Sequence, residues 1–246
     1  MATPRIYVNS PLDTGSEIVL DAAPANHLVN VLRLKSGAPV IFFNGEGGEY
    51  AGVLSTVTKK VVGITLEAFN DKDNESPLKV HLGQVIAKGE RMDYALQKSA
   101  ELGVAEITPV ISERCEVRLK GERLIKKLAH WQRIVNSACE QCQRNRVPRV
   151  NPPQRLDEWL SLREEAIRWI GHPDSSMASS SSREQVSSPT SAAVLIGPEG
   201  GFSEAEFVLA RAQGFEGKLF GTRVLRAETA PVVALTLLQS QWGDLP

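Results

Sequence analysis

Two segments of this chain place glycines beside charged side chains, a combination that suits ligand binding. The first, residues 194–206, passes from an apolar run into a turn with three glycines and a proline, and then into a helix. Ser203 and Glu206 have the spacing of a capping box, which fixes the start of that helix. Glycines directly after a strand let the backbone approach a ligand closely, at the edge where open α/β sheets bind. The segment therefore predicts a binding site rather than only a tight connection.

The second segment, residues 219–230, ends another apolar run at Gly221 and continues with two arginines and a carboxylate. Thr229 follows as a candidate helix cap. Because both segments carry glycine where a strand ends, we expect them to line one pocket. A plain surface ion pair between Arg226 and Glu228, which would stabilise little, is the alternative interpretation of these charges.

Patterns typical of several other chemistries are missing from the sequence. It contains neither G-x-G-x-x-G nor G-x-x-x-x-G-K-[ST], which disfavours dinucleotide and P-loop sites. H-E-x-x-H and G-x-S-x-G are also missing, which argues against hydrolytic chemistry. Cys139 and Cys142 form a single C-x-x-C inside a helical pattern, so we expect structural cysteines and no metal site.

Composition places the chain among ordinary globular proteins. Its 246 residues carry 28 basic and 29 acidic side chains, without an apolar run long enough for a membrane span or a recognisable secretory signal. We therefore expect a cytoplasmic protein. The charges are unevenly distributed, because residues 76–150 hold 14 basic and 8 acidic side chains, a net charge of +6. That part ends with Arg144, Arg146 and Arg149, which indicate either a polyanion bound on one face or a solvated helix end.

The order of predicted elements indicates two domains. Strands over residues 39–43, 49–57 and 60–69, with a helix over 25–34, are typical of a small barrel-like domain. In that helix Leu28, Val31 and Leu32 recur at helical spacing. The polar residues 70–77 follow as a linker.

After the linker, strands and helices alternate, which is typical of an α/β domain with a largely parallel sheet. The predicted strands cover residues 79–87, 105–110, 169–171, 192–196 and 217–220. The predicted helices cover residues 91–102, 122–142, 158–168, 203–213 and 229–239. Residues 174–191 hold nine serines and are expected to form a flexible surface insertion.

Several blocks of residues together resemble the ribosomal RNA small subunit methyltransferase E family, which belongs to the SPOUT class of knotted methyltransferases. The most specific blocks are IGPEGGFS over residues 196–203 and RVLRAETA over residues 223–230. The resemblance extends to residues 27–33, 88–103 and 140–145, in family order over nearly the whole chain. Phe220 departs from the leucine expected before Gly221, and the serine-rich insertion is not a family feature.

The resemblance implies an N-terminal PUA-like β-barrel over residues 1–73 and a C-terminal SPOUT α/β domain with a trefoil knot over 77–246, working as a homodimer. It also implies S-adenosylmethionine as the cofactor. The substrate would be N3 of one uridine near the decoding site of 16S rRNA in the small ribosomal subunit. The residues expected around the cofactor are Leu195, Ile196, Gly197, Gly200, Gly201, Phe220, Gly221, Val224, Leu225 and Thr229.

The same resemblance suggests roles for the charged residues. Arg226 would stabilise negative charge on the uracil, while Glu199 or Glu228 would act as general base or position the ring. Five arginines are expected to contact the RNA backbone: Arg5, Arg33, Arg91, Arg144 and Arg146. The alternatives are a non-catalytic RNA-binding or ribosome-assembly protein and a SPOUT methyltransferase that acts on another RNA, such as transfer RNA.

Overall fold

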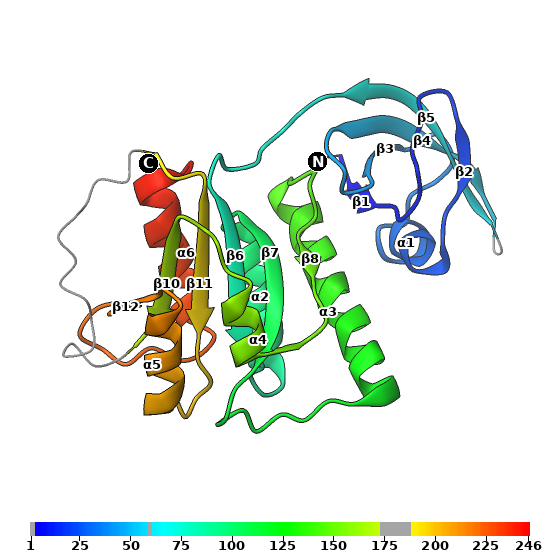
Figure 1. The fold of residues 1–246 in the computed structure, drawn as a ribbon. Helices are drawn as coiled ribbons and strands as arrows, with labels where there is room; N and C mark the ends of the chain where they lie inside the picture. The colour runs from blue at the N-terminus through cyan, green and yellow to red at the C-terminus, as the bar shows by residue number, and fades with distance from the viewer. Residues whose placement is uncertain (1–2, 59–60, 173–187) are drawn as a thin grey trace. The chain divides into compact units, whose positions relative to one another are not determined.

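The computed structural model divides the chain into two compact units (Figure 1) and describes residues 3–58, 61–172 and 188–246. The first unit comprises residues 1–75 and 136–147, and the second comprises residues 76–135 and 148–246. This division differs from one cut at the predicted linker, because residues 136–147 belong with the N-terminal part of the chain. Of the predicted serine-rich insertion, 174–191, residues 174–187 lie outside the described residues.

The first unit is built on a sheet with the strand order β1-β3-β4-β5-β2. Neighbouring strands are antiparallel except β1 and β3, which are parallel. The strands are β1 (Arg5–Tyr7), β2 (Glu17–Val19), β3 (Pro39–Phe43), β4 (Glu49–Val57) and β5 (Val62–Asn70). Phe42, Leu54 and Ile64 are fully buried in its core. The prediction of the three longer strands is confirmed. β1 and β2 were not predicted, because each has only three residues, too few to show an alternating pattern.

The helix predicted over residues 25–34 differs in form. α1 (Ala22–Asn26) continues directly into a π-helix, η1 (His27–Val31), whose last backbone hydrogen bond spans five residues at 2.9 Å. The wider turn changes which side chains face inward, so that Leu28 is fully buried while Val31 is exposed. The predicted α-helical spacing of the apolar residues is therefore wrong here.

The second unit contains a parallel sheet with the order β12-β10-β11-β6-β7-β8, and β9 pairs with β7. The strands are β6 (Lys79–Val85), β7 (Val104–Ile111), β8 (Arg149–Val150), β9 (Gln154–Arg155), β10 (Ile167–Gly171), β11 (Ser191–Ile196) and β12 (Glu216–Lys218). The central strands β6 and β11 are buried along nearly their whole length, as expected for strands covered on both faces, but only β11 is almost continuously apolar, because β6 also carries His81 and Gln84. The prediction of an α/β domain with a parallel sheet is confirmed.

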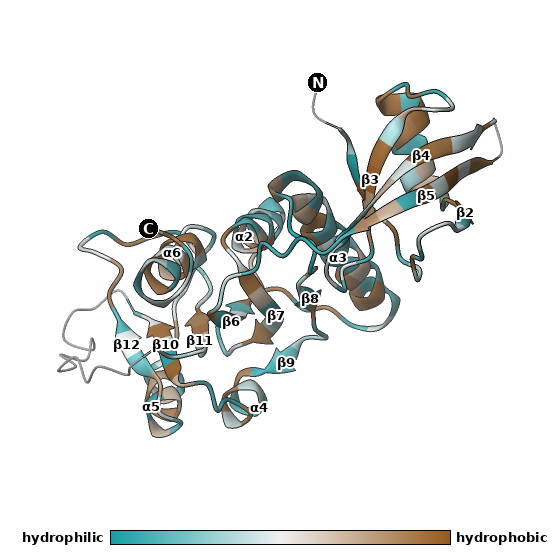
Figure 2. Ribbon diagram, turned by 90° about the horizontal axis from the view of Figure 1, so that it is seen from above, coloured by the Kyte–Doolittle hydropathy of each residue, from teal (hydrophilic) through white to brown (hydrophobic). Residues whose placement is uncertain are grey.

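Helices cover both faces of this sheet (Figure 2). One face carries α2 (Glu90–Glu101), α3 (Gly121–Cys142) and α6 (Ala230–Trp242), and the other carries α4 (Leu156–Ser161) and α5 (Glu204–Ala212). After α2, Gly103 adopts the left-handed conformation (φ +78°) that its predicted place beyond the helix end requires. None of the helices in the described residues is both long and apolar enough to cross a membrane.

One predicted helix of this unit is wrong in its second half. The expectation placed a helix over residues 158–168, but α4 ends at Ser161 and β10 begins at Ile167. Arg163 and Glu165, which favour helix by composition, instead bond to each other at 3.0 Å beside the buried His81. A tertiary contact therefore overrides the local helix preference.

Because the strands are parallel, the carboxyl ends of β6, β10 and β11 meet at one edge of the sheet, where ligands bind in open α/β folds. The glycine-rich turn after β11 leads from this edge into α5. The trefoil knot implied by the family resemblance stays a prediction.

Candidate functional site

A pocket of about 500 Å³ lies at this edge of the second unit. It is lined by residues from the carboxyl end of β10, from the turn between β11 and α5, and from the loop between β12 and α6. The expectation that the two glycine-bearing segments line one pocket is confirmed. A volume of this size is typical of small-molecule and cofactor sites.

The local structure of the glycine-rich turn follows from its residues. Gly201 has φ +67°, and its N–H donates to the Pro198 carbonyl oxygen over 2.9 Å. At Gly197, a Cβ atom would lie 3.0 Å from the Phe202 ring, which is tighter than an ordinary contact. Ser203 then begins α5 with a complete capping box, as predicted.

Most of the residues expected around the cofactor line the pocket. Those that do are Ile196, Gly197, Gly200, Gly201, Phe220, Gly221, Val224 and Leu225. Leu195 is instead fully buried within β11, and Thr229 lies outside the lining, at the start of α6, where its side chain makes no capping hydrogen bond. Sequence reasoning missed Gly171, the last residue of β10, and His172, which follows it, because this short strand lacks a glycine-rich motif of its own.

Glu199 lines the pocket and forms an ion pair with Arg91, whose Nη1 lies 2.8 Å from the Glu199 Oε1. Arg91 comes from the first turn of α2 and lines the same pocket. Burial acts to raise the pKa of Glu199, but hydrogen bonds from backbone N–H groups and from Arg91, with the Arg91 charge, outweigh it and lower the pKa. Glu199 is therefore a carboxylate held by a fixed cation.

Arg226 and Glu228 have different surroundings. The Arg226 side chain lines the pocket and is 77% exposed, so its guanidinium is accessible to a ligand. Glu228 does not line the pocket, and its side chain is 15% exposed. Its Oε1 lies 4.0 Å from Arg226, and its buried Oε2 has no hydrogen-bond partner within the described residues. A buried carboxylate oxygen without a partner is costly and often marks a functional group.

Four of the arginines expected to contact RNA lie in the first unit, and they differ in accessibility. Arg5 is largely buried, pairs with Glu49 and donates to the Asn145 Oδ1 over 2.6 Å. Arg144 is buried as well, and its Nε donates to Glu75 over 3.0 Å. These contacts leave both guanidinium groups little surface for a phosphate.

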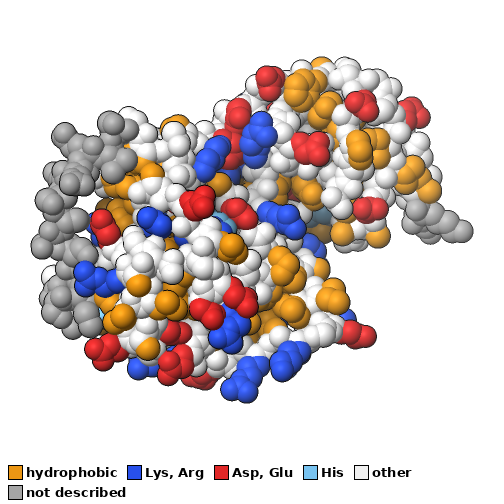
Figure 3. Space-filling model, in the orientation of Figure 1, with side chains coloured by type: hydrophobic (Ala, Val, Ile, Leu, Met, Phe, Trp, Pro, Cys, Tyr) orange, Lys and Arg blue, Asp and Glu red, His pale blue; other side chains and the backbone are white. Residues whose placement is uncertain are grey.

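Arg146 and Arg33 are the accessible members of this set. Arg146 is 53% exposed, although it donates to the Glu46 carbonyl oxygen over 2.8 Å. Arg33 is exposed at the end of η1, with φ +55°. Lysine, arginine and carboxylate side chains are interspersed over the face shown in Figure 3.

The cysteines of the C-x-x-C segment are part of the α3 packing. Cys139 is buried, and its hydrogen bond with Cys142, together with burial, raises its pKa. A raised pKa disfavours the thiolate that metal binding and redox chemistry require. Among the described residues, no group of histidine, cysteine and carboxylate side chains is arranged to hold a metal ion.

Comparisons with known proteins agree with this architecture. A family model of an RNA methyltransferase domain matches residues 74–239, and a model of an RNA methyltransferase PUA domain matches residues 20–66. The chain is 35% identical to a ribosomal RNA small subunit methyltransferase E of Buchnera aphidicola subsp. Schizaphis graminum, over 98% of each protein. It is 30% identical to the protein of that name from Bacillus subtilis, over 93% of this chain and 89% of the relative.

Solved structures extend the similarity to both domains. A putative methyltransferase from Legionella pneumophila, in complex with the bound cofactor SAM, has a TM-score of 0.94 at 41% identity, with 100% of both chains covered. A ribosomal RNA small subunit methyltransferase E from Neisseria gonorrhoeae, bound to S-adenosyl methionine, has a TM-score of 0.89 at 38% identity, also over 100% of both chains. The fold and the pocket thus define a SPOUT-like RNA methyltransferase with a PUA-like N-terminal domain. Within that class, the chain belongs to the ribosomal RNA small subunit methyltransferase E family.

Proposed function

We propose that this protein binds S-adenosylmethionine in the glycine-lined pocket and methylates N3 of one uridine near the decoding site of 16S rRNA, in the small ribosomal subunit. The observation that carries the proposal is the pocket itself, in which glycine backbone, apolar walls and arginines meet at the carboxyl ends of parallel strands. The two related structures that hold this cofactor support the assignment. The site of action would be the cytoplasm, where ribosomes are assembled.

The residues of the pocket fit S-adenosylmethionine. Ile196 and Leu225 provide apolar walls suited to the adenine, and the glycines between residues 197 and 201 let backbone groups come within hydrogen-bonding distance of polar ligand atoms. When bound, the cofactor supplies an electrophilic methyl group carried on its sulfonium sulfur. The protein then has to bring a nucleophilic nitrogen to that methyl group.

The N3 atom of uracil bears a proton at neutral pH and becomes a nucleophile only when that proton leaves. Negative charge then develops on the two uracil oxygens. Arg226 is exposed at the pocket, so its guanidinium can approach the base and stabilise this charge as a fixed cation. This role requires no movement of a buried group.

A general base must accept the N3 proton, and the two candidate carboxylates are unequal. Glu199 has a lowered pKa and is already paired with Arg91, which makes it a weak base for this proton. Glu228 has a buried oxygen without a partner among the described residues and lies beside Arg226. We therefore assign proton removal to Glu228, and we assign to Glu199 the role of holding Arg91 at the pocket.

The protein is also proposed to work as a homodimer through α6 and the loop before it. α6 contains no charged residue, and most of its side chains are apolar. Leu237 of α6 is nevertheless exposed, as is 82% of Val224 in the preceding loop. Light scattering should give about twice the chain mass of 26.8 kDa; the mass of one chain would contradict the dimer.

The decisive experiment incubates the purified protein with radiolabelled S-adenosylmethionine and small ribosomal subunits from cells that lack the endogenous activity. Nucleoside analysis should find the label as 3-methyluridine at a single position. Cofactor binding without any label would point to another RNA substrate, and transfer RNA is then the first to try. Absence of both binding and label would favour a non-catalytic RNA-binding or ribosome-assembly role.

A further inference from the structure

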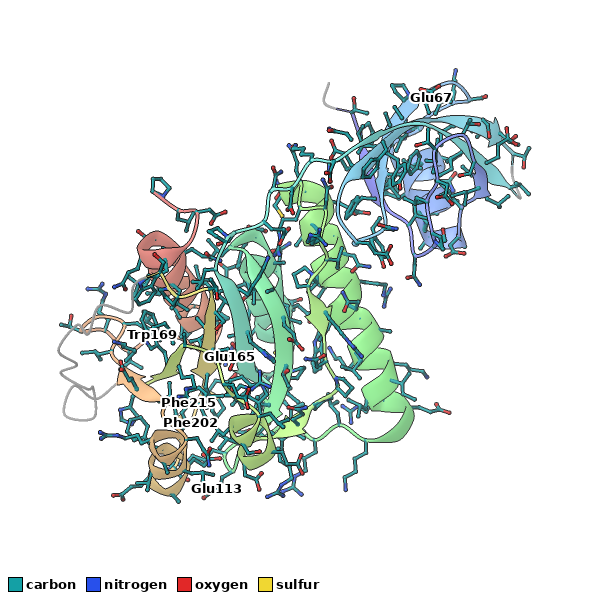
Figure 4. The ribbon with its side chains drawn as sticks, turned by 45° about the horizontal axis from the view of Figure 1, so that its top comes forward. Glu67, Glu113, Glu165, Trp169, Phe202 and Phe215 are labelled. Atoms are coloured by element: carbon teal, nitrogen blue, oxygen red, sulfur yellow. The ribbon has the colours of Figure 1, made fainter. Side chains whose placement is uncertain are left out.

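The segment that follows β7, residues 112–117, contacts the glycine-rich turn from outside the pocket. Arg114 Nη1 donates to the Gly200 carbonyl oxygen over 2.9 Å. One residue earlier, the Glu113 N–H donates to the Glu206 Oε1 over 2.7 Å, and Figure 4 shows Glu113 beside α5. Two successive residues of this segment are therefore bonded to the turn and to the first helical turn after it.

The contact with Glu206 reinforces the start of α5. Its second oxygen, Oε2, accepts the Ser203 N–H over 3.0 Å, and the Ser203 hydroxyl accepts the Glu206 N–H over 3.3 Å. The carboxylate thus belongs to the capping box and binds the Glu113 backbone at the same time. The end of the turn is fixed by this arrangement independently of Arg114.

Arg114 acts at the middle of the turn, on the peptide that joins Gly200 to Gly201. The carbonyl oxygen of this peptide accepts from Arg114, and its N–H donates to the Pro198 carbonyl oxygen over 2.9 Å. Both polar groups of one peptide are therefore bonded, so it cannot rotate without breaking a hydrogen bond. Glycines have wide conformational freedom, and this turn would otherwise sample several orientations.

We propose that Arg114 is a positioning residue for the cofactor: it fixes the Gly200–Gly201 peptide in the orientation that S-adenosylmethionine requires, without itself lining the pocket. The inference rests on the proposed binding of that cofactor. Ordering the turn before binding removes an entropic cost that the cofactor would otherwise have to offset. The loss of Arg114 should therefore weaken cofactor affinity more than it changes the stability of the fold.

A rival role for an exposed arginine near this site is a contact to an RNA phosphate. The two roles can be told apart by experiment. A phosphate contact would change the salt dependence of RNA affinity, whereas a positioning role would change the affinity for the cofactor measured in the absence of RNA. Arg118 lies in the same loop and is also exposed, so Arg118→Ala provides a control with the same change of charge.

The test measures S-adenosylmethionine binding by titration calorimetry in the full chain without RNA. Arg114→Ala should weaken binding about fivefold to tenfold, the size of one charge-assisted hydrogen bond at an exposed position. Arg114→Lys should recover part of the loss, and Arg118→Ala should bind like the wild type. Amide hydrogen exchange in residues 200–206 should accelerate in Arg114→Ala while the thermal midpoint stays within a few degrees.

Unchanged cofactor affinity in Arg114→Ala would overturn the inference. If that variant instead lowered the salt slope of RNA binding by about one, Arg114 would be a phosphate contact. Failure of the wild-type protein to bind the cofactor would have a different meaning, because it would remove the proposed function on which the inference rests.

Discussion

Glu199 and Glu228 carry the same functional group and lie near the same pocket, but their neighbours give them different chemistry. Arg91 holds Glu199 in its charged form at a distance of 2.8 Å, whereas one oxygen of Glu228 is buried without a partner among the described residues. This difference is the reason why we propose that Glu199 orients an arginine and that Glu228 accepts a proton.

Substituting each carboxylate by its amide should separate the two roles. Glu228→Gln should lower the single-turnover rate of methyl transfer about 100-fold or more, because it removes the base. Glu199→Gln should lower it by less than about tenfold and act mainly on substrate affinity through Arg91. Arg226→Ala should also lose about 100-fold in rate, with normal cofactor affinity. Rates measured between pH 6 and pH 9 check these expectations, and a larger loss in Glu199→Gln than in Glu228→Gln would reverse the assignment.

At this scale, the sequence identifies residue types but not their partners. The glycines and Arg226 stand out in the sequence because they interrupt apolar runs, and they do line the pocket. The pairing of Arg91 with Glu199 joins residues 108 positions apart, and Arg114 reaches Gly200 across 86 positions. No local pattern encodes such contacts, because they depend on which strand ends meet at the edge of the sheet.

Among the elements, β6 carries a buried histidine that joins β7 to the segment after α4. The His81 Nε2 lies 2.8 Å from the Thr108 hydroxyl, and its Nδ1 is hydrogen-bonded to Arg163. Because a guanidinium can only donate, Nδ1 accepts this hydrogen bond, which favours the neutral imidazole. Glu165, labelled in Figure 4, completes the group at 3.0 Å from Arg163.

This arrangement makes the fold sensitive to acid. Burial first, and the Arg163 charge second, lower the pKa of His81 from 6.5 to about 4. Between these pH values the unfolded chain binds a proton that the folded protein does not, so stability falls as the pH falls. The loss is about 1.4 kcal/mol per pH unit, or about 3 kcal/mol in total by pH 4.

Urea unfolding at several pH values between 7 and 4 measures this effect. In His81→Gln, which keeps a polar side chain beside Thr108, the free energy of unfolding should depend less on pH than in the wild type. The difference between the two proteins isolates His81 from the carboxylates that titrate in the same range. Parallel curves for the two proteins would show that His81 does not contribute.

Helices and strands were predicted well where the pattern of apolar and polar residues was long. They were predicted poorly where contacts between residues distant in the sequence determine the local structure. The long amphipathic α3, the alternating strand β6 and the apolar strand β11 follow directly from the sequence pattern. The two-residue strands β8 and β9 have no periodicity to detect, and the His81 group ends a helix that composition favours. The π-helix is likewise set by packing around Leu28 rather than by local preference.

For the molecule as a whole, the predicted arginine contacts with RNA divide into exposed and buried ones. Arg146→Ala should lower the salt slope of RNA affinity by about one, because an exposed guanidinium can neutralise one phosphate. Arg144→Ala should instead destabilise the fold by about 3 kcal/mol, because it leaves the buried Glu75 carboxylate unpaired. Filter binding at several salt concentrations and urea unfolding distinguish the two effects; equal behaviour of the two variants would contradict the division.

The membership of residues 136–147 in the first unit has a consequence for how this protein is made. The carboxylate of Glu75 pairs with Arg144, 69 positions later in the chain, and Glu49, which Arg5 also contacts, accepts a hydrogen bond from Asn145, 96 positions later. On the ribosome, the N-terminal 75 residues emerge first but lack these partners until residue 145 has been synthesised. We therefore expect the N-terminal unit to reach its full stability only after residues 136–147 have been synthesised.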